Sequence, residues 1–159
     1  MLTSPGTTMG TVTYMSPEQA LARNFDTELL REGLYLVAFT EGDVEGLRRH
    51  AAWATGRPEQ SSMLFWQASA EAFSGKLNNA RELFRQSFEA AERQRLRENA
   101  ASATAQEALT EACFGNFHQG REKAAKAMAM AGSREVLWDG AAALALSGDV
   151  GGAAIPDAA

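Results

Sequence analysis

The chain has 159 residues, of which 45% are hydrophobic and 22% are charged. This length and this hydrophobic content are enough for one folded domain with a core. Its formal net charge of −5 argues against a general nucleic-acid or anionic-membrane binder, because such proteins need a basic face. The single cysteine, Cys113, has no partner for an intramolecular disulfide or a cysteine-based zinc site.

Residues 1–24 differ in composition from the rest of the chain. Thr, Ser, Pro and Gly dominate their first part, which predicts an extended, flexible arm. The run Ser16-Pro17-Glu18-Gln19 is a capping box and predicts a short helix that starts at Pro17.

There is no signal-peptide pattern and no apolar run of about 18 to 20 residues. We therefore expect a cytoplasmic protein.

Helical periodicity divides residues 26–159 into consecutive helices, which predicts an all-α fold. Asp26 is the expected N-cap of the first of them, and Gly56 and Pro58 separate the second from the third. Pro156 is expected to cut the last helix short. The expected helices span residues 27–41, 44–55, 61–74, 77–97, 99–114, 117–131, 133–147 and 150–155.

Glycine turns join these helices into hairpins. A glycine with an apolar residue two positions later recurs at intervals of 33, 40 and 33 residues: Gly42, Gly75, Gly115 and Gly148. Such a period is typical of stacked helical hairpins, and each glycine is expected to adopt the left-handed conformation that ends a helix. The residues expected to cap the next helices have short polar side chains: Asp43, Asn116, Ser133 and Asp149.

The glycine turn, with Ala80, Phe84 and Ser87 at small, aromatic and small positions after it, resembles the tetratricopeptide repeat (TPR) family. The resemblance covers residues 26–159, with the last repeat incomplete. It implies a right-handed stack of about four helical hairpins, an α-solenoid, that binds protein partners. Glu71 stands where the family usually has tyrosine, as does Glu111 in the next hairpin.

The run from Gly10-Thr11 to Ser16-Pro17-Glu18 resembles the end of the activation segment in bacterial Ser/Thr protein kinases of the eukaryotic type. By this resemblance, Thr7 and Thr8 fall where such kinases are often autophosphorylated, and Thr11 matches a threonine near the catalytic aspartate. The glycine-rich loop, the strand lysine, the His-Arg-Asp loop and the Asp-Phe-Gly motif are absent from the sequence. We therefore expect no enzyme activity from the chain by itself.

A partner groove is expected on the face formed by the first helix of each hairpin. The repeat frame places ten residues on this face: Glu32, Leu36, Phe39, Phe65, Ser69, Phe73, Ala105, Leu109, Glu135 and Trp138. We select the large apolar ones as the groove: Leu36, Phe39, Phe65, Phe73, Leu109 and Trp138. The expected partner is an apolar or helical protein segment. No catalytic, cofactor-binding or metal-binding residues are expected.

Several single residues are interpreted as structural. Packing in the core or between helices is favoured over a ligand cage for the tryptophans Trp53, Trp66 and Trp138. His50 is placed on a charged face, and Cys113 is expected to be a small buried hydrophobe. Two glutamate–arginine pairs recur ten residues apart and are interpreted as ion pairs within a hairpin: Glu71 with Arg81, and Glu111 with Arg121.

Three hypotheses for the function remain open at this point. The first is a non-catalytic protein-interaction scaffold derived from a kinase that carries repeats. The second is a truncated piece of a Ser/Thr protein kinase whose activation segment is at most a phosphoacceptor at Thr7, Thr8 or Thr11. The third is that the chain has no independent role. We also expect either fraying of the helix near the C-terminus or concentration-dependent self-association through its apolar residues: Trp138, Leu144 and Leu146.

Overall fold

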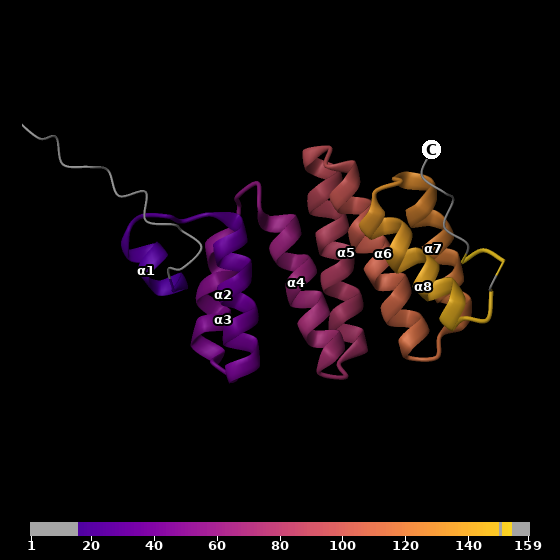
Figure 1. Ribbon diagram of the computed structural model, residues 1–159, viewed down its shortest axis with the longest axis horizontal. Coiled ribbons are helices and arrows are strands. Elements are labelled where there is room, and N and C mark those ends of the chain that lie inside the picture. The colour runs from indigo at the N-terminus through magenta and orange to yellow at the C-terminus, as the bar shows by residue number, and fades with distance from the viewer. Residues whose placement is uncertain (1–15, 150, 154–159) are drawn as a thin grey trace, which may run out of the picture. The chain divides into compact units, whose positions relative to one another are not determined.

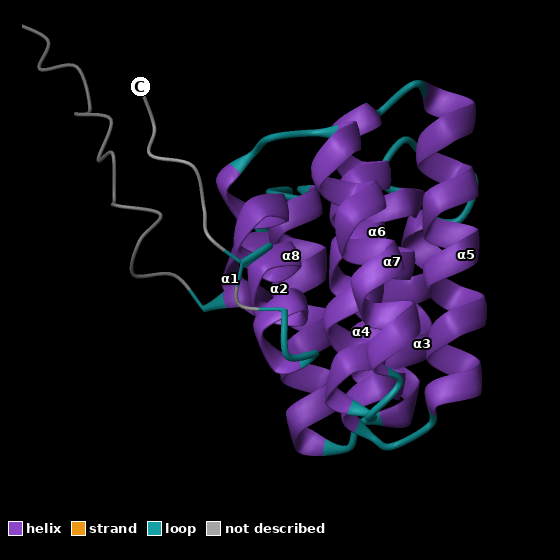
Figure 2. Cartoon of the chain, turned by 90° about the vertical axis from the view of Figure 1, so that its right-hand side faces the viewer, coloured by secondary structure: helices purple, strands orange, loops and turns teal. Residues whose placement is uncertain are grey.

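A computed structural model describes residues 16–149 and 151–153, which form eight α-helices and no strand (Figures 1 and 2). The predicted all-α class is therefore confirmed. None of these helices combines the length and the apolar character that crossing a bilayer requires. Their bounds are α1 Pro17–Ala22, α2 Glu28–Glu41, α3 Val44–Ala54, α4 Gln60–Phe73, α5 Leu77–Gln94, α6 Arg97–Cys113, α7 Phe117–Met130 and α8 Arg134–Leu146.

The chain divides into two compact units, residues 1–50 and 51–159, and the boundary falls within α3. The first unit contains α1, α2 and most of α3. The second contains the end of α3 and the five helices α4 to α8. The expected arm over residues 1–15 and the expected helix at 150–155 lie mostly outside the described residues, although 151–153 form a turn.

The repeated glycine turn is regular in all four hairpins. Its glycines, Gly42, Gly75, Gly115 and Gly148, have φ between 71° and 81°, as predicted. In each turn, the amide of the residue that follows the glycine donates a hydrogen bond at 2.9 Å. The acceptor is the carbonyl of the residue four positions before the glycine. Only glycine reaches this left-handed conformation without a Cβ penalty. The same closure therefore ends every first helix.

The capping box of α1 is confirmed, because the Ser16 hydroxyl accepts from the Gln19 amide at 3.3 Å and the Gln19 side chain accepts from the Ser16 amide at 3.2 Å. The prediction that Asp26 caps the next helix is wrong. Thr27 is the N-cap of α2, and its hydroxyl accepts from the Leu30 amide. Asp26 instead accepts two hydrogen bonds from a guanidinium group one turn into α2.

Caps at the hairpin turns follow the prediction only in part. Asp43 accepts from the amide of Gly46, and Asp149 accepts from the amide of Gly152, both at 2.9 Å. Asn116 and Ser133 occupy N-cap positions but make no capping hydrogen bond. The Asn116 side chain is turned back to the preceding helix, where it donates to a carboxylate. The Asn116 side chain therefore binds the Glu111 carboxylate instead of capping α7.

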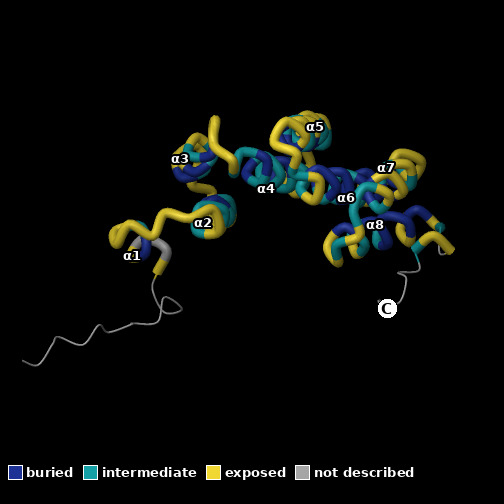
Figure 3. Tube along the Cα trace, turned by 90° about the horizontal axis from the view of Figure 1, so that it is seen from above, coloured by how far each residue is buried: buried dark blue, intermediate teal, exposed yellow. Residues whose placement is uncertain are grey.

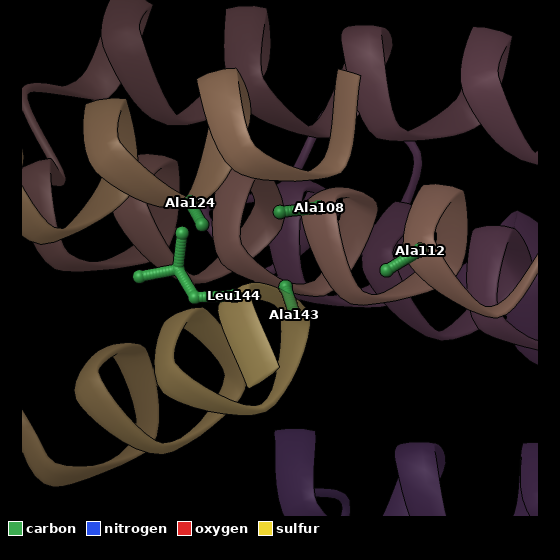
Figure 4. Close-up of a cluster of buried hydrophobic side chains, with 5 residues drawn as sticks. All are labelled: Ala108, Ala112, Ala124, Ala143 and Leu144. Atoms are coloured by element: carbon green, nitrogen blue, oxygen red, sulfur yellow. The ribbon is translucent and has the colours of Figure 1, made fainter. Parts of the chain in front are cut away.

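Helix α6 is the centre of the second unit, since it packs against α5, α7 and α8. Figure 3 shows α5 and α7 on the same side of it. Alanine dominates its buried positions, and these small side chains allow neighbouring helices to approach closely. One apolar cluster joins α6, α7 and α8 (Figure 4): Ala108, Ala112, Ala124, Ala143 and Leu144.

The tryptophans are less buried than predicted. Trp53 and Trp66 are half-buried. Arg57 stacks over the Trp53 ring, with its guanidinium carbon 4.6 Å from the ring centroid. Trp138 is 67% exposed, so the prediction that it belongs to the core is wrong. Its position on the outer face of α8 explains the difference, because no described residue covers that face.

Candidate functional site

The residues of the expected partner groove are divided by the structure. Leu36 and Phe39 are half-buried in the first unit. In the second unit, Phe65 packs against the Ala68, Ala80 and Phe84 cluster, and Leu109 packs against the cluster of Figure 4. Both therefore contribute to the core. The two strongly exposed aromatic rings of this set are Phe73, which is 86% exposed, and Trp138.

A second surface was not expected from the sequence. An open cleft of about 580 Å³ lies between α5 and α7, and α6 forms its floor; we call it the α5–α7 cleft. One stripe from each helix lines it. These stripes are Asn78, Arg81, Glu82, Phe84, Arg85 and Phe88 from α5, Thr104, Glu107 and Glu111 from α6, and Gln119, Lys123 and Lys126 from α7.

An ion pair between neighbouring hairpins is part of the lining of the α5–α7 cleft. Glu111 is 1% exposed, and both of its oxygens accept from Arg81, at 2.6 Å from Nε and 2.8 Å from Nη2. The prediction of Glu71–Arg81 and Glu111–Arg121 pairs within hairpins is therefore wrong. The glutamate is held by the arginine of the preceding hairpin. Glu71 instead accepts from Lys76 and Asn79, both beside its own turn.

Hydrogen bonds outweigh burial in setting the charge of Glu111. Burial alone would raise the pKa of this carboxyl group. The hydrogen bonds from Arg81 and Asn116, together with the charge of Arg81, nevertheless hold its pKa below the ordinary value. The same contact raises the pKa of Arg81. Both groups are therefore charged throughout the physiological range.

The other charges along the cleft are also largely neutralised. Lys123 pairs with Glu107 at 3.0 Å across the α6–α7 contact. On α5, hydrogen bonds from Arg85 and Gln86 lower the pKa of Glu82 to about 2. Lys126 differs, because its ammonium group lies over the ring of Phe88, 4.7 Å from the centroid. The other cations that line the described part of the cleft each face a carboxylate, whereas Lys126 faces a ring.

Part of the same lining pattern recurs one hairpin later. A second open cleft, of about 530 Å³, is lined by His118, Arg121, Glu122, Ala125, Leu144 and Asp149. The first four stand forty residues after Asn78, Arg81, Glu82 and Arg85. Leu144 occupies the position of Glu111, four residues before the turn glycine. Arg121 therefore has no carboxylate there and donates to the Ser147 carbonyl at 2.7 Å.

Two further predictions about single residues are wrong. His50 is 3% exposed instead of lying on a charged surface, and Arg31 donates to its Nδ1 at 3.4 Å. Burial, together with the charges of Arg49 and Arg31, lowers its pKa. Cys113 is exposed at the end of α6 instead of buried.

Apart from Lys126, the charged groups along the α5–α7 cleft are arranged in ion pairs. Each carboxylate that lines the α5–α7 cleft is held by a cation. Among the described residues, no three His, Cys, Asp or Glu side chains gather as metal ligands would.

The sequence contains a recurring arginine that points to this cleft. Arginine stands six residues after the turn glycine in the first three hairpins: Arg48, Arg81 and Arg121. Finding the cleft also required knowing that this arginine faces the next hairpin. No protein-family model matches the chain, and comparison with curated proteins and with solved structures gave no match.

Proposed function

We propose that the chain is a non-catalytic protein-interaction scaffold of TPR-like hairpins, and that the α5–α7 cleft binds a peptide or helix of the partner. The observation that carries the proposal is the open cleft itself, which is lined by residues of α5, α6 and α7. Grooves between helices commonly accept an amphipathic helix. Ala80, Phe84 and Ser87, on which the TPR resemblance rests, are all buried along α5, which supports the proposal.

The lining of the cleft indicates the chemistry of the partner. The floor carboxylates are saturated by Arg81 and Lys123, so they would repel further acidic groups only weakly. Lys126 offers a cation beside an aromatic ring. A helix with an acidic side chain next to an apolar one would satisfy both features.

A second face remains a candidate for the same function. Phe73 and Trp138, both on first helices, expose aromatic rings of the kind that anchor protein interfaces. The expected partner there is the apolar or helical segment proposed from the sequence. The cleft is favoured because residues of three helices line it together, whereas the second face offers two separate rings.

The origin of the chain is part of the proposal. The resemblance over residues 10–20 supports descent from a bacterial Ser/Thr protein kinase with C-terminal repeats, and the lone cysteine is compatible with a cytoplasmic location. The alternative, a kinase piece that serves as a phosphoacceptor, concerns Thr7, Thr8 and Thr11, which lie outside the described residues. Incubation with an active kinase of this class and phosphopeptide mapping would test it. An absence of phosphate on residues 1–13 would contradict it.

Selection of peptides tests the cleft directly. Random 16-residue peptides displayed on phage are selected against the full chain and then counter-screened against a Lys123→Glu, Lys126→Glu double variant. We expect binders with acidic and apolar residues at helical spacing, which the double variant no longer retains. A Phe73→Ala variant is the control and should retain them. Binders that lose affinity for the control but not for the cleft variant would place the site on the first helices instead.

A further inference from the structure

Helix α8 exposes a side on which apolar groups lie beside the charged Glu135. Trp138 is 67% exposed and Leu146 is 53% exposed, with Ala145 also exposed and Ala142 half-buried between them. We call these four apolar residues the tail face. The prediction that Leu144 takes part in self-association is wrong, because Leu144 is buried in the core cluster. An exposed tryptophan beside further apolar groups is unusual on a monomeric surface and is typical of an interface.

The repeat shows what kind of element covers such a position. Trp138 stands ten residues before Gly148, as Ala105 stands ten residues before Gly115. Ala105 is fully buried, in a cluster with Val136 of α8. Within the second unit, this position is therefore covered by the first helix of the next hairpin. The tail face continues that established interface, and no described residue covers it.

The complementary surface can be found by the same equivalence. Val136, twelve residues before Gly148, is the residue that α8 presents to the preceding hairpin, and it is fully buried. The residue twelve positions before Gly42 is Leu30 on α2. Leu30 lines an apolar pocket of about 310 Å³ between α1 and α2, which we call the head pocket: Ala20, Phe25, Thr27, Leu29, Leu30, Gly33 and Leu34.

The surface around the head pocket is more exposed than its counterpart on α8. Val37 stands five residues before Gly42 and is 41% exposed, whereas Ala143, five residues before Gly148, is fully buried. Leu29, on the rim of the pocket, is 80% exposed. This side of α2 therefore carries the apolar surface that a preceding first helix would cover.

We infer that two copies of this chain associate head to tail, with α8 of one copy packed on α2 of the next and the Trp138 ring in the head pocket. The contact repeats between molecules the interface that α6 and α8 form within one. It joins two different surfaces, so it is heterologous and would extend into a chain of copies or close into a ring. This interface is separate from the α5–α7 cleft and goes beyond the proposed function.

Two single variants of the full chain test the contact. Leu29→Glu places a charge on the rim of the head pocket, and the fold should tolerate it, since acidic residues are favourable in the first turn of a helix. Trp138→Glu places a charge on the tail face. Phe73→Glu is the control, because Phe73 is even more exposed than Trp138 but belongs to neither surface. Circular dichroism verifies that all three variants remain helical.

Sedimentation velocity over a range of concentrations gives the result. We expect the wild type and the control to form species larger than a dimer as the concentration rises. Each of the other two variants should weaken association at least ~30-fold, the effect of losing a strong interface residue. An equimolar mixture of the two should form a one-to-one dimer and nothing larger, because each supplies the surface that the other lacks.

Three outcomes would overturn the inference. A wild type that stays monomeric at the highest concentration reached would show that another partner, or another segment, covers these surfaces. Association of Leu29→Glu at wild-type strength, with Trp138→Glu monomeric, would show a symmetric contact between two α8 helices. A mixture of the two variants that remains monomeric would exclude a heterologous contact.

Discussion

Removing the guanidinium of Arg81 should destabilise the second unit far more than its surface position suggests. The Arg81→Ala substitution leaves Glu111, which is 1% exposed, with a single remaining side-chain donor, Asn116. Losing one partner of a buried ion pair costs ~3–5 kcal/mol. Arg81 itself is 39% exposed, so water can partly replace it. We therefore expect a loss at or somewhat below the lower limit of this range, ~2–3 kcal/mol.

The pH dependence identifies the cause. The folded-state pKa of Glu111 lies below its ordinary value, so its contribution to stability is complete above about pH 4.3 and is lost as the pH falls through the folded pKa. In Arg81→Ala, most of this compensation is lost, since only Asn116 and the charge of Lys123 still oppose burial, which favours the protonated carboxyl group. The difference in unfolding free energy between the wild type and the variant should therefore be largest at pH 7 and shrink in acid.

Urea unfolding followed by circular dichroism at pH 7 and pH 4 measures both effects. The matched control is Lys76→Ala, which removes the partner of Glu71, because that pair is more exposed on both sides. Exposed pairs contribute ~0.2–1 kcal/mol, and the control should fall in this range. Equal losses for Arg81→Ala and Lys76→Ala at pH 7 would refute the argument that the Arg81–Glu111 pair is buried and essential.

Three further predictions concern other parts of the chain. The pKa of His50 is lowered from 6.5, so the contribution of this residue to stability should be complete above pH 6.5 and should be lost as the pH falls below it. Amide exchange in α2 should therefore accelerate in acid in the wild type, but not in a His50→Gln variant. Gly120→Ala should cost ~1 kcal/mol in urea unfolding, because its Cβ would lie 3.3 Å from the Ala108 carbonyl, whereas Gly33→Ala, with nothing within 4 Å, should stabilise. Isothermal titration with Mg-ATP should give no binding heat, because the sequence lacks every phosphate-holding motif of a kinase; micromolar binding would contradict this reasoning.

The hairpin architecture could be predicted because its determinants are local. The left-handed glycine at Gly75, the helix after it and the capping box at Ser16 depend on neighbours within five residues, and each is found where the sequence placed it. The predicted single helix over residues 77–97 ends earlier, at Gln94. Arg95 adopts a left-handed conformation there that its sequence did not indicate.

The side-chain contacts between hairpins could not be predicted in the same way. Glu111 lies near Arg121 in sequence, but the structure pairs it with Arg81, thirty residues away. Which arginine a buried carboxylate meets depends on the offset between neighbouring hairpins, and the sequence does not encode this locally. Trp138 was predicted to be buried and is exposed, whereas His50 was predicted to be exposed and is buried. The reason is the same, since burial depends on what packs across a face and not on the residues beside it in sequence.

The longer spacing between Gly75 and Gly115 has a structural consequence for the proposed site. α5 has 18 residues and α6 has 17, against 14 in α7 and 13 in α8, so each is about one turn longer than its counterpart in the next hairpin. A whole extra turn keeps the apolar face of each helix directed at the core. The extension therefore lengthens α5 and the floor helix together without rotating their lining stripes. The added turns, residues 91–94 of α5 and 97–100 of α6, lie beyond the residues that line the α5–α7 cleft. The 40-residue spacing is therefore explained by one extra turn in each of two packed helices, and the lining of the proposed site does not depend on it.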